Sequence, residues 1–460
     1  MINDLNIVGG TVVSSNGLKK ATISIKDGKI SYISESKKIV PAKKVLEVTN
    51  CIIMPGMIDS HVHVRAPSFS HREDFQTGTR AAAAGGVTTI VEMPVSNPPT
   101  SNVKTLKNRI KNASENAYVD FGFWAGIGTD NVDEADKLAE CGIVGFKTFL
   151  MPPPESREDE FQGLCTDDEK SLKNVLAAVV KTGLLLAIHA EDNSVISKQM
   201  ELIKSQGQND LHGFSSSRPP ISEILAISSV IRIQMHHNAN ILICHVSTPL
   251  SIEVIHEAKA MGLNMYAETC PQYILLSEEK ISKFGPFARV KPPIRKEKLR
   301  KELWTQFKNG LIDILSSDHA PYLEYEKNKG KDDIWMAPDG IPGLELSLPL
   351  LLNKVTDGEI TYQDIVKMFS EHPAKLLGFY PKKGTLEIGS DADIVIVRPN
   401  MHSKVLLNNL FTKARNSVKV YEEFPLTHSI EYTISRGEIV FNKGKIVGNV
   451  GHGNFISPIM

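Results

Sequence analysis

Short runs of alternating apolar and polar residues occupy both ends of the chain. The first 50 residues contain LNIVGGTVV, ATISIKDGKISYIS and KVLEVTN, with a pair typical of a hairpin turn at Asp27-Gly28. The C-terminal part contains ADIVIVRP and EYTISRGEIVFNKGKIVG, with turns expected at Arg436-Gly437 and Lys443-Gly444. Because chain ends often lie close together in folded domains, we predict one small β-sandwich domain built from both termini.

In the central part of the chain, strand-like apolar runs alternate with helix-like segments. The helix-forming TGTRAAAAGG ends at Gly85-Gly86 and is followed by GVTTIVEMP; later runs are VDFGFWAGI, VGFKTFL, LLLAIHAED, ILICHVST, LNMYAET and LIDILSSDHA. About eight such βα units over about 330 residues predict an α/β chain with a (β/α)8 TIM-like barrel. A doubly wound sheet is the alternative, but no G-x-G-x-x-G opens a helix here.

This pattern divides the chain into three stretches. We predict that residues 1–54 form the first part of the β-domain, residues 55–384 the barrel, and residues 385–460 the second part of the β-domain. The length of 460 residues is sufficient for one large barrel and a small accessory domain.

The composition is that of an ordinary globular protein, with 41% hydrophobic residues, 23% charged residues and a formal net charge of −1. That balance gives no indication of a nucleic-acid or membrane partner held by bulk electrostatics. The N-terminus has no basic segment typical of a signal peptide, and no apolar run approaches the ~20 residues that cross a bilayer. We therefore expect a cytoplasmic protein without nucleic-acid or membrane partners.

The five cysteines are odd in number and scattered, and no C-x-x-C pair occurs. This pattern argues against a disulfide framework and against a thiolate zinc site. Any bound metal must therefore use nitrogen and oxygen ligands.

Histidines and an aspartate follow the strand-like runs in a way that suggests a metal site. His61 and His63 are two residues apart in PGMIDSHVHVR, so on a strand both imidazoles face the same side. His189, His245 and Asp318 each come just after an apolar run. In a barrel these positions form the C-terminal rim, where active sites lie. Satisfied core histidines are the alternative for any one of them, but the coincidence of all five favours a metal site.

Lys147 lies within the apolar run VGFKTFL, where an ammonium group is costly to bury without a partner. A lysine that extends to the surface at a strand end is one interpretation. The other is that the neutral amine reacts with CO₂ to give a carbamate. Its two oxygens would then bridge two divalent ions, one bound by His61 and His63 and the other by His189 and His245.

Several segments together resemble the cyclic amidohydrolases, namely dihydroorotases, allantoinases and hydantoinases. They are PGMIDSHVHVR, AAAAGGVTTIVEMP, GFKTFL, HAED, CHVST, ETCPQY, KPPIR, SSDHAP and GSDADIVIV, in the expected order over nearly the whole chain. The resemblance implies the barrel and the two-ended β-domain. It also implies a binuclear site, usually of zinc, at His61, His63, carboxylated Lys147, His189, His245 and Asp318.

Such a site implies a hydrolase that opens a C–N bond of a small cyclic ureide or imide. A hydroxide that bridges the two metals attacks the ring carbonyl, and one metal stabilises the oxyanion. Asp318 then carries the proton from the attacking water to the departing ring nitrogen. Covalent catalysis is not favoured, because the sequence contains neither a G-x-S-x-G elbow nor a cysteine placed as an activated nucleophile.

The sequence points to more than one substrate. Dihydroorotases bind the substrate carboxylate with an Arg after H-x-H-x, an Asn in M-P-N and the last His of D-H-A-P-H. Arg65 matches the first, but Val95 and Tyr322 replace the other two. Arg65 is two residues beyond His63, so we expect it to project from the same strand and to face the pocket. The alternative to a substrate carboxylate is an ion pair with Glu73 or Asp74. We predict a substrate site that contains Arg65 and Tyr322, with Asn97 or Lys291 as compensating donors.

Three functional hypotheses follow. The first is dihydroorotase-like hydrolysis, which interconverts dihydroorotate and N-carbamoyl-aspartate, and the second is allantoinase or hydantoinase (dihydropyrimidinase) activity. The third, a scaffold without catalysis, is disfavoured because all six candidate ligands are present. The resemblance further implies a homodimer or homotetramer.

Overall fold

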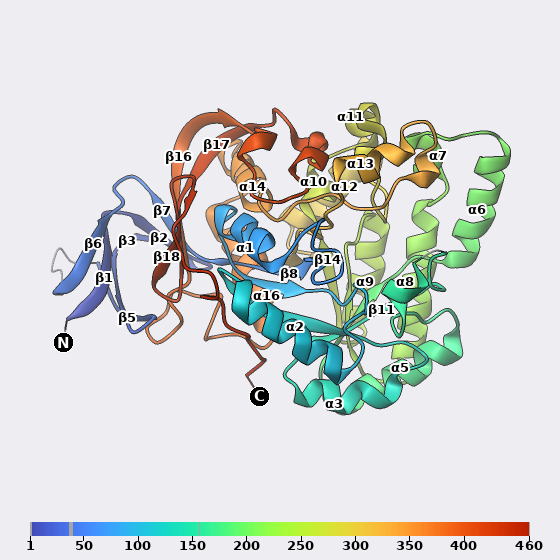
Figure 1. Cartoon of the computed structure of the whole chain (residues 1–460), viewed down its shortest axis with the longest axis horizontal. Helices are drawn as coiled ribbons and strands as arrows, with labels where there is room; N and C mark the ends of the chain where they lie inside the picture. Colours follow the sequence, from blue (N-terminus) through green and yellow to red (C-terminus); the bar gives the residue numbers. More distant parts are fainter. Residues whose placement is uncertain (1, 36–39, 156, 460) are drawn as a thin grey trace.

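The computed structural model describes residues 2–35, 40–155 and 157–459, and its parts are an α/β barrel and a pair of β-sheets beside it (Figure 1). The barrel contains eight parallel strands in the order in which they follow one another along the chain. They are β8 (Met57–Val62), β9 (Val87–Glu92), β10 (Asp120–Gly126), β11 (Gly145–Phe149), β12 (Leu185–His189), β13 (Asn240–Ile243), β14 (Met265–Thr269) and β15 (Ile314–Leu315). The predicted fold class is thereby confirmed.

The barrel closes between its first and last strands. Val62 pairs in parallel with His319, and the backbone N–H of His63 donates to the carbonyl of His319 over 2.9 Å. Residues of β9 to β11 are buried throughout, as expected of parallel strands covered on both sides. This closure brings the chain after β15 next to the end of β8.

Helices follow the strands around the outside of the barrel. The principal ones are α1 (Phe75–Ala84), α2 (Val103–Asn116), α3 (Ala135–Glu140), α5 (Glu169–Thr182), α8 (Pro220–Gln234), α9 (Pro249–Ala260) and α12 (Glu297–Lys308). Additional helices lie in the connections: α4 (Glu158–Phe161), α6 (Asn193–Ser205), α7 (Leu211–Ser216), α10 (Pro271–Leu275), α11 (Glu278–Ile281), α13 (Glu324–Lys327), α14 (Ser347–Thr356), α15 (Tyr362–Val366) and α16 (His372–Leu376).

Helix α1 illustrates how local sequence sets these boundaries. Asp74 caps its N-terminus by accepting from the Thr77 N–H over 2.7 Å. Gly86, with a φ of 79°, ends it in the left-handed conformation that glycine adopts without steric cost. The alanines between are buried, which allows the helix to approach β9 closely. The predicted helix–turn–strand order is confirmed here.

Two further sheets form the second part of the molecule. One has the order β5-β4-β1-β6, with β1 (Asn3–Val8), β4 (Thr22–Lys26), β5 (Lys29–Ser34) and β6 (Ala42–Glu47). The other has the order β19-β18-β17-β16-β7-β2-β3, with β2 (Thr11–Ser14), β3 (Gly17–Lys20), β7 (Ile52–Pro55), β16 (Ile394–Lys404), β17 (Pro425–Ser435), β18 (Glu438–Asn442) and β19 (Lys445–Ile446).

Both chain ends contribute to this second part, as predicted. Strand β7 pairs antiparallel with β16, so N-terminal and C-terminal segments share one sheet. Ile23, Ile53 and Ile394 belong to one apolar cluster between the sheets. The predicted turns are present: Asp27, Arg436 and Lys443 have φ values of 49°, 45° and 45°, and each is followed by a glycine with positive φ.

The last residues leave the sheets and contact the barrel. Phe455 pairs with Phe121 of β10, and Ile456 joins the apolar cluster that contains Trp124. The range 385–460, predicted as the second part of the β-domain, thus includes a segment that packs on the barrel. All five cysteines are free, and no helix in the described ranges combines the length and apolar character needed to cross a bilayer.

Candidate active site

The six predicted metal ligands lie at the carboxyl ends of the barrel strands. His61 is in β8 with His63 just after it, Lys147 is in β11, and His189 ends β12; His245 and Asp318 follow β13 and β15. The five besides Lys147 line one cavity of about 90 Å³. All six are buried.

One group of ligands is formed by His61, His63 and Asp318. The Asp318 Oδ1 atom lies 3.3 Å from His61 Nε2 and 3.4 Å from His63 Nε2. The ligand atoms of these three residues all lie within 4.8 Å of one another. Burial disfavours a charged imidazole, yet the carboxylates of Glu268 and Asp318 raise the pKa of His61 to about 10. Negative charge sufficient to attract a cation is therefore present.

A second group is formed by His189 and His245. Their Nδ1 and Nε2 atoms, respectively, lie 3.0 Å apart. His189 Nε2 lies 2.9 Å from Glu191 Oε2, and Glu191 also forms an ion pair with Arg218. A carboxylate behind a histidine orients the ring and makes it a better ligand, so this arrangement is typical of a metal site.

Lys147 has an environment that fits a modified amine. It is fully buried, and its Nζ has no hydrogen-bond partner among the described residues. The nearest aromatic ring is that of Phe149, whose centroid lies 5.0 Å from Nζ. A buried ammonium group without a partner is unstable. A carbamate on this nitrogen would instead carry a negative charge and two oxygen atoms, which could serve as ligands for divalent cations. The residues present therefore fit a binuclear centre.

Arg65 reaches the cavity by a route that the sequence did not predict. We expected it to extend the strand of His61 and His63, but β8 ends at Val62 and Arg65 has a φ of 68°. The prediction of a continuous strand was therefore wrong, because the backbone turns into the left-handed region after closing on His319. The side chain still lines the cavity and is only 3% exposed.

The contacts of Arg65 involve neutral oxygens only. Nη1 donates to the Val95 carbonyl over 3.5 Å and Nη2 to Tyr322 Oη over 3.4 Å, both at the long limit of a hydrogen bond. Its Nε has no partner among the described residues. The nearby carboxylates considered from the sequence are engaged elsewhere: Asp74 pairs with Lys413, and Glu73 accepts from Thr412.

The other predicted substrate residues differ in position. Tyr322 and Lys291 line the cavity, but Asn97 is not among the lining residues. Lys291 Nζ forms an ion pair with Asp339 at 2.8 Å. Burial lowers the pKa of Lys291 to about 8, while Asp339 opposes that shift. Asp339 also pairs with Arg289 at 2.7 Å, so Lys291 shares its carboxylate partner with a second cation.

Some residues of the site were not found from the sequence. Glu268 accepts from His61 Nδ1 and from the His245 N–H, at 2.8 and 3.1 Å, and so connects the two ligand groups. Glu268 is the next-to-last residue of the predicted strand LNMYAET, and Glu191 lies two residues after His189 in LLLAIHAED, so position near a strand end was the available signal. Arg157 and Asp339 lie in connections far from any motif, and no pattern indicated them.

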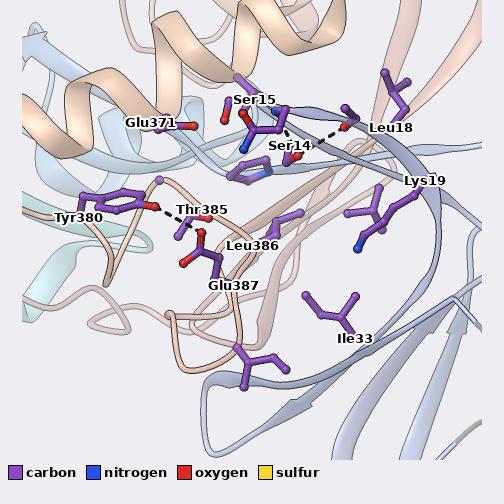
Figure 2. A pocket seen from close by; sticks show the side chains of 17 residues that line it. Ser14, Ser15, Leu18, Lys19, Ile33, Glu371, Tyr380, Thr385, Leu386 and Glu387 are labelled. Atoms are coloured by element: carbon purple, nitrogen blue, oxygen red, sulfur yellow. Dashed lines mark hydrogen bonds between the residues drawn. The ribbon is translucent and has the colours of Figure 1, made fainter.

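Two other features could be mistaken for a site. A cleft of about 790 Å³ lies between the β2–β3 turn and residues 384–388, where Tyr380 donates to Glu387 over 3.3 Å (Figure 2). No histidine, cysteine or aspartate is among the described residues that line it. The buried carboxylates of Asp120, Asp391 and Asp393 are close together, but all three form ion pairs with Lys383. Asp120 and Asp391 are also paired with Arg436 and Lys29, respectively.

Comparison with known proteins identifies related sequences over most of the chain. The sequence profile described as "Amidohydrolase family" matches residues 52–440. An L-hydantoinase of Paenarthrobacter aurescens is 33% identical over 99% of this chain and 98% of its own length. An allantoinase of Streptomyces avermitilis is 34% identical over 94% of both chains, and a dihydroorotase of Methanosarcina acetivorans is 30% identical over 98% of this chain and 95% of its own.

A solved structure gives the same result for the fold. The L-hydantoinase (dihydropyrimidinase) from Arthrobacter aurescens superposes with a TM-score of 0.95 at 32% identity, covering 99% of this chain and all of the other. The relatives carry three different substrate names at similar identity. Similarity alone therefore identifies the class of bond and not the ring.

Proposed function

The chain belongs to the amidohydrolase family and is a hydrolase of cyclic amides, and from that premise we propose that it opens a ring that carries a carboxylate, as dihydroorotate does. The observation that supports this choice is Arg65. It is a buried guanidinium whose hydrogen-bond acceptors among the described residues are neutral oxygens. A buried charge requires a counter-charge, and a substrate carboxylate beside the cavity supplies one.

His61, His63, His189, His245, Asp318 and Lys147 as a carbamate would hold two divalent cations, for which zinc is compatible with the nitrogen and oxygen donors. Carboxylation joins Lys147 Nζ to the carbon of CO₂ and releases one proton. When bound, such a pair of cations lowers the pKa of a water molecule and polarises the scissile carbonyl.

Asp318 moves the proton. It lies within 3.4 Å of the nitrogens of both His61 and His63, and burial raises the pKa of its carboxyl. A carboxylate so placed accepts a proton from the attacking water and donates it to the departing ring nitrogen. Glu268 keeps the His61 ring oriented by accepting from its Nδ1.

A neutral ring, such as allantoin or a hydantoin, is the second candidate. It is supported by the names of the hydantoinase and allantoinase relatives and by the apolar wall of the cavity, where Phe149, Met151 and Phe161 lie. A cytoplasmic location and a homodimer or homotetramer stay predictions.

Arg65→Ala distinguishes the two candidates. The variant should lower kcat/KM for dihydroorotate by about 10²-fold or more, because charge-assisted hydrogen bonds contribute about 1.5–3 kcal/mol each. Turnover of allantoin should change by only a few-fold. Arg80→Ala is the matched control, because Arg80 also stacks on a tyrosine, Tyr118, and donates a hydrogen bond of 3.1 Å to its hydroxyl. Neither residue lines the cavity. Equal losses on both substrates would exclude the role proposed for Arg65.

A further inference from the structure

Arg157 is a second arginine that lines the cavity, and it comes from a different part of the barrel. It lies in the connection between β11 and α5, directly before α4. Its Nε and Nη2 donate to the two carboxylate oxygens of Glu160, both over 2.8 Å. Its guanidinium carbon lies 5.1 Å from the centre of the Phe161 ring. The side chain is thus held by its own short helix.

The ion pair with Glu160 uses one edge of the guanidinium and leaves another edge available. Nη1 of Arg157 has no hydrogen-bond partner among the described residues. A guanidinium has five N–H donors, and a carboxylate can bind it along two parallel hydrogen bonds. The edge formed by Nη1 and Nη2 can therefore donate hydrogen bonds to a second carboxylate while the Nε and Nη2 edge stays paired with Glu160.

The charges around the cavity also favour an anionic ligand. Burial lowers the pKa of Arg65, and the positive charge of Arg157 lowers it further, so the two guanidinium groups act on each other. Glu160 is the carboxylate that raises the pKa of both. Asp339 also raises the pKa of Arg157, but its carboxylate is shared by ion pairs with Arg289 and Lys291. Among the described residues, Glu160 forms an ion pair with Arg157, while the hydrogen bonds of Arg65 go to neutral oxygens. One of the two guanidinium groups therefore lacks a direct anionic partner, which an anionic ligand would supply.

We propose that Arg157 determines specificity by binding, together with Arg65, an anionic substituent of the ring, with Glu160 positioning its guanidinium. This inference rests on the proposed function, since it assigns a substrate class to the same cavity. The ligand class is a cyclic ureide or imide with a carboxylate on the ring or one carbon away from it. The loop that carries Arg157 also supplies Met151 and Pro154 to the cavity wall, so one segment provides both apolar contact and charge.

The test compares an acid with its uncharged isostere. Dihydroorotate and dihydroorotamide have substituents of similar shape, but the carboxamide is neutral and has an NH2 donor in place of one carboxylate oxygen. Arg157→Met removes the guanidinium but leaves Glu160 buried without a partner, so the decisive variant is the double substitution Arg157→Met with Glu160→Gln. We expect kcat/KM for the acid to fall about 10- to 100-fold, mostly through KM, and that for the amide to stay within about threefold.

Two controls separate recognition from loop structure. Glu160→Gln alone retains the Arg157 cation but weakens the pair that positions it, so the preference for the acid should fall by less than in the double variant. Arg232→Met, which breaks a comparable two-point ion pair with Glu169 away from the cavity, should leave both substrates unchanged. Equal losses on acid and amide in the double variant, or no loss on the acid, would overturn the proposal.

Equilibrium binding measurements test the anion site separately from the proposed ring-opening reaction. Calorimetry of zinc-loaded protein with dihydroorotate and dihydroorotamide requires no turnover. If the wild type opens neither ring but binds the acid at least tenfold more tightly, and the double variant loses that preference, the proposed reaction fails and the anion site stands. If the wild type binds both equally, the anion site is refuted.

Discussion

Three residues of the cavity have backbone conformations that side chains rarely adopt. Arg65, His245 and Asp318 have φ values of 68°, 38° and 46°. Left-handed backbone costs about 1–2 kcal/mol at a non-glycine residue, so it persists where surrounding contacts fix it. Here the His245 N–H is held by Glu268 and the Ser317 N–H by Asp59, at 3.1 Å each. Strain at these positions is therefore the consequence of aiming side chains into one cavity.

Asp318→Asn tests the proton-transfer role. The substitution preserves size but removes the group that accepts a proton, so kcat should fall by at least ~10²-fold, as expected for loss of a general acid–base. Asp313→Asn is the matched control, because Asp313 precedes the same strand at its opposite end and accepts from the Ala267 N–H. Steady-state kinetics at equal metal content provide the measurement. Activity of Asp318→Asn within a few-fold of wild type would assign the proton transfer to another group.

Lys147→Ala tests the carbamate. Without the bridging oxygens the protein should purify with less metal and lack activity, and a short carboxylic acid added to the buffer should restore part of both. Metal analysis and turnover with and without added acetate or propionate are the readouts, and wild-type protein with the same additions is the control. Full activity and full metal content in Lys147→Ala would contradict the carbamate.

The sequence locates residues whose position on one strand distinguishes them. His189, His245 and Asp318 follow apolar runs, His61 and His63 are two residues apart on one predicted strand, and Lys147 lies within an apolar run. All six remain proposed ligands. Glu268, Arg157 and Asp339 were missed, since their roles depend on contacts between segments that are distant in the chain. The left-handed turn at Arg65 was missed for the same reason: the partner of that backbone is His319, more than 250 residues later.

Among the elements, a buried ion network joins barrel, sheets and C-terminal segment. Lys383 Nζ lies 2.7 Å from Asp120 of β10 and 2.5 Å from Asp393 before β16. Arg436, in the turn between β17 and β18, also binds Asp120, at 3.0 Å. Asp120 further accepts from the Asn454 N–H over 2.8 Å. Four segments of the chain thus meet at these buried charged groups, each of which requires an oppositely charged partner to be stable.

Lys383→Met should destabilise the protein strongly. Removing one partner leaves buried carboxylates unpaired, which costs about 3–5 kcal/mol of unfolding free energy. Lys259→Met, which breaks the partly exposed pair with Asp313, should cost about 1 kcal/mol or less. Thermal or urea unfolding compares the two. Similar small losses in both would mean that the network does not hold the parts together.

The stability loss in Lys383→Met should depend on pH, because it comes from the buried carboxyl groups around Lys383. Burial already raises the pKa of Asp393 above its ordinary value, and the ammonium of Lys383 opposes that shift. Without Lys383 the pKa rises further, so the folded variant binds more protons than the unfolded chain and becomes relatively more stable as pH falls. The difference between Lys383→Met and wild type should therefore shrink between pH 7.5 and pH 5.5. A difference that grows on acidification would contradict this reasoning.

The barrel strands were predictable because apolar composition and length mark them, whereas the connections were not. Strand β15 has only two residues, yet the run LIDILSSDHA indicated it correctly. The segment between β16 and β17 contacts the barrel through Thr412 and Glu73, although sequence pattern assigned it to the β-domain. Its hydrogen bonds join residues more than 300 positions apart, and such pairing has no local signature.

Across the whole molecule, the barrel provides the site and the two chain ends provide a β-structure beside it (Figure 1). The two-ended arrangement was predictable from the similar strand and turn patterns at both termini. The substrate was not, since relatives with the same fold carry the names hydantoinase, allantoinase and dihydroorotase. We propose that the ring is selected by a few of the side chains that line the cavity of about 90 Å³.

The central claim is that the molecule is a metal-dependent hydrolase of cyclic amides. The most direct test is a ring-opening assay of chelated and zinc-reconstituted protein with dihydroorotate, allantoin, hydantoin and dihydrouracil, with products separated and quantified. We predict that reconstituted protein opens at least one ring, with dihydroorotate opened fastest, that chelation abolishes the rate and that zinc restores it. If protein reconstituted with two equivalents of zinc opens none of the four rings, or if chelated protein retains its full rate, the molecule is not a metal-dependent hydrolase of these cyclic amides.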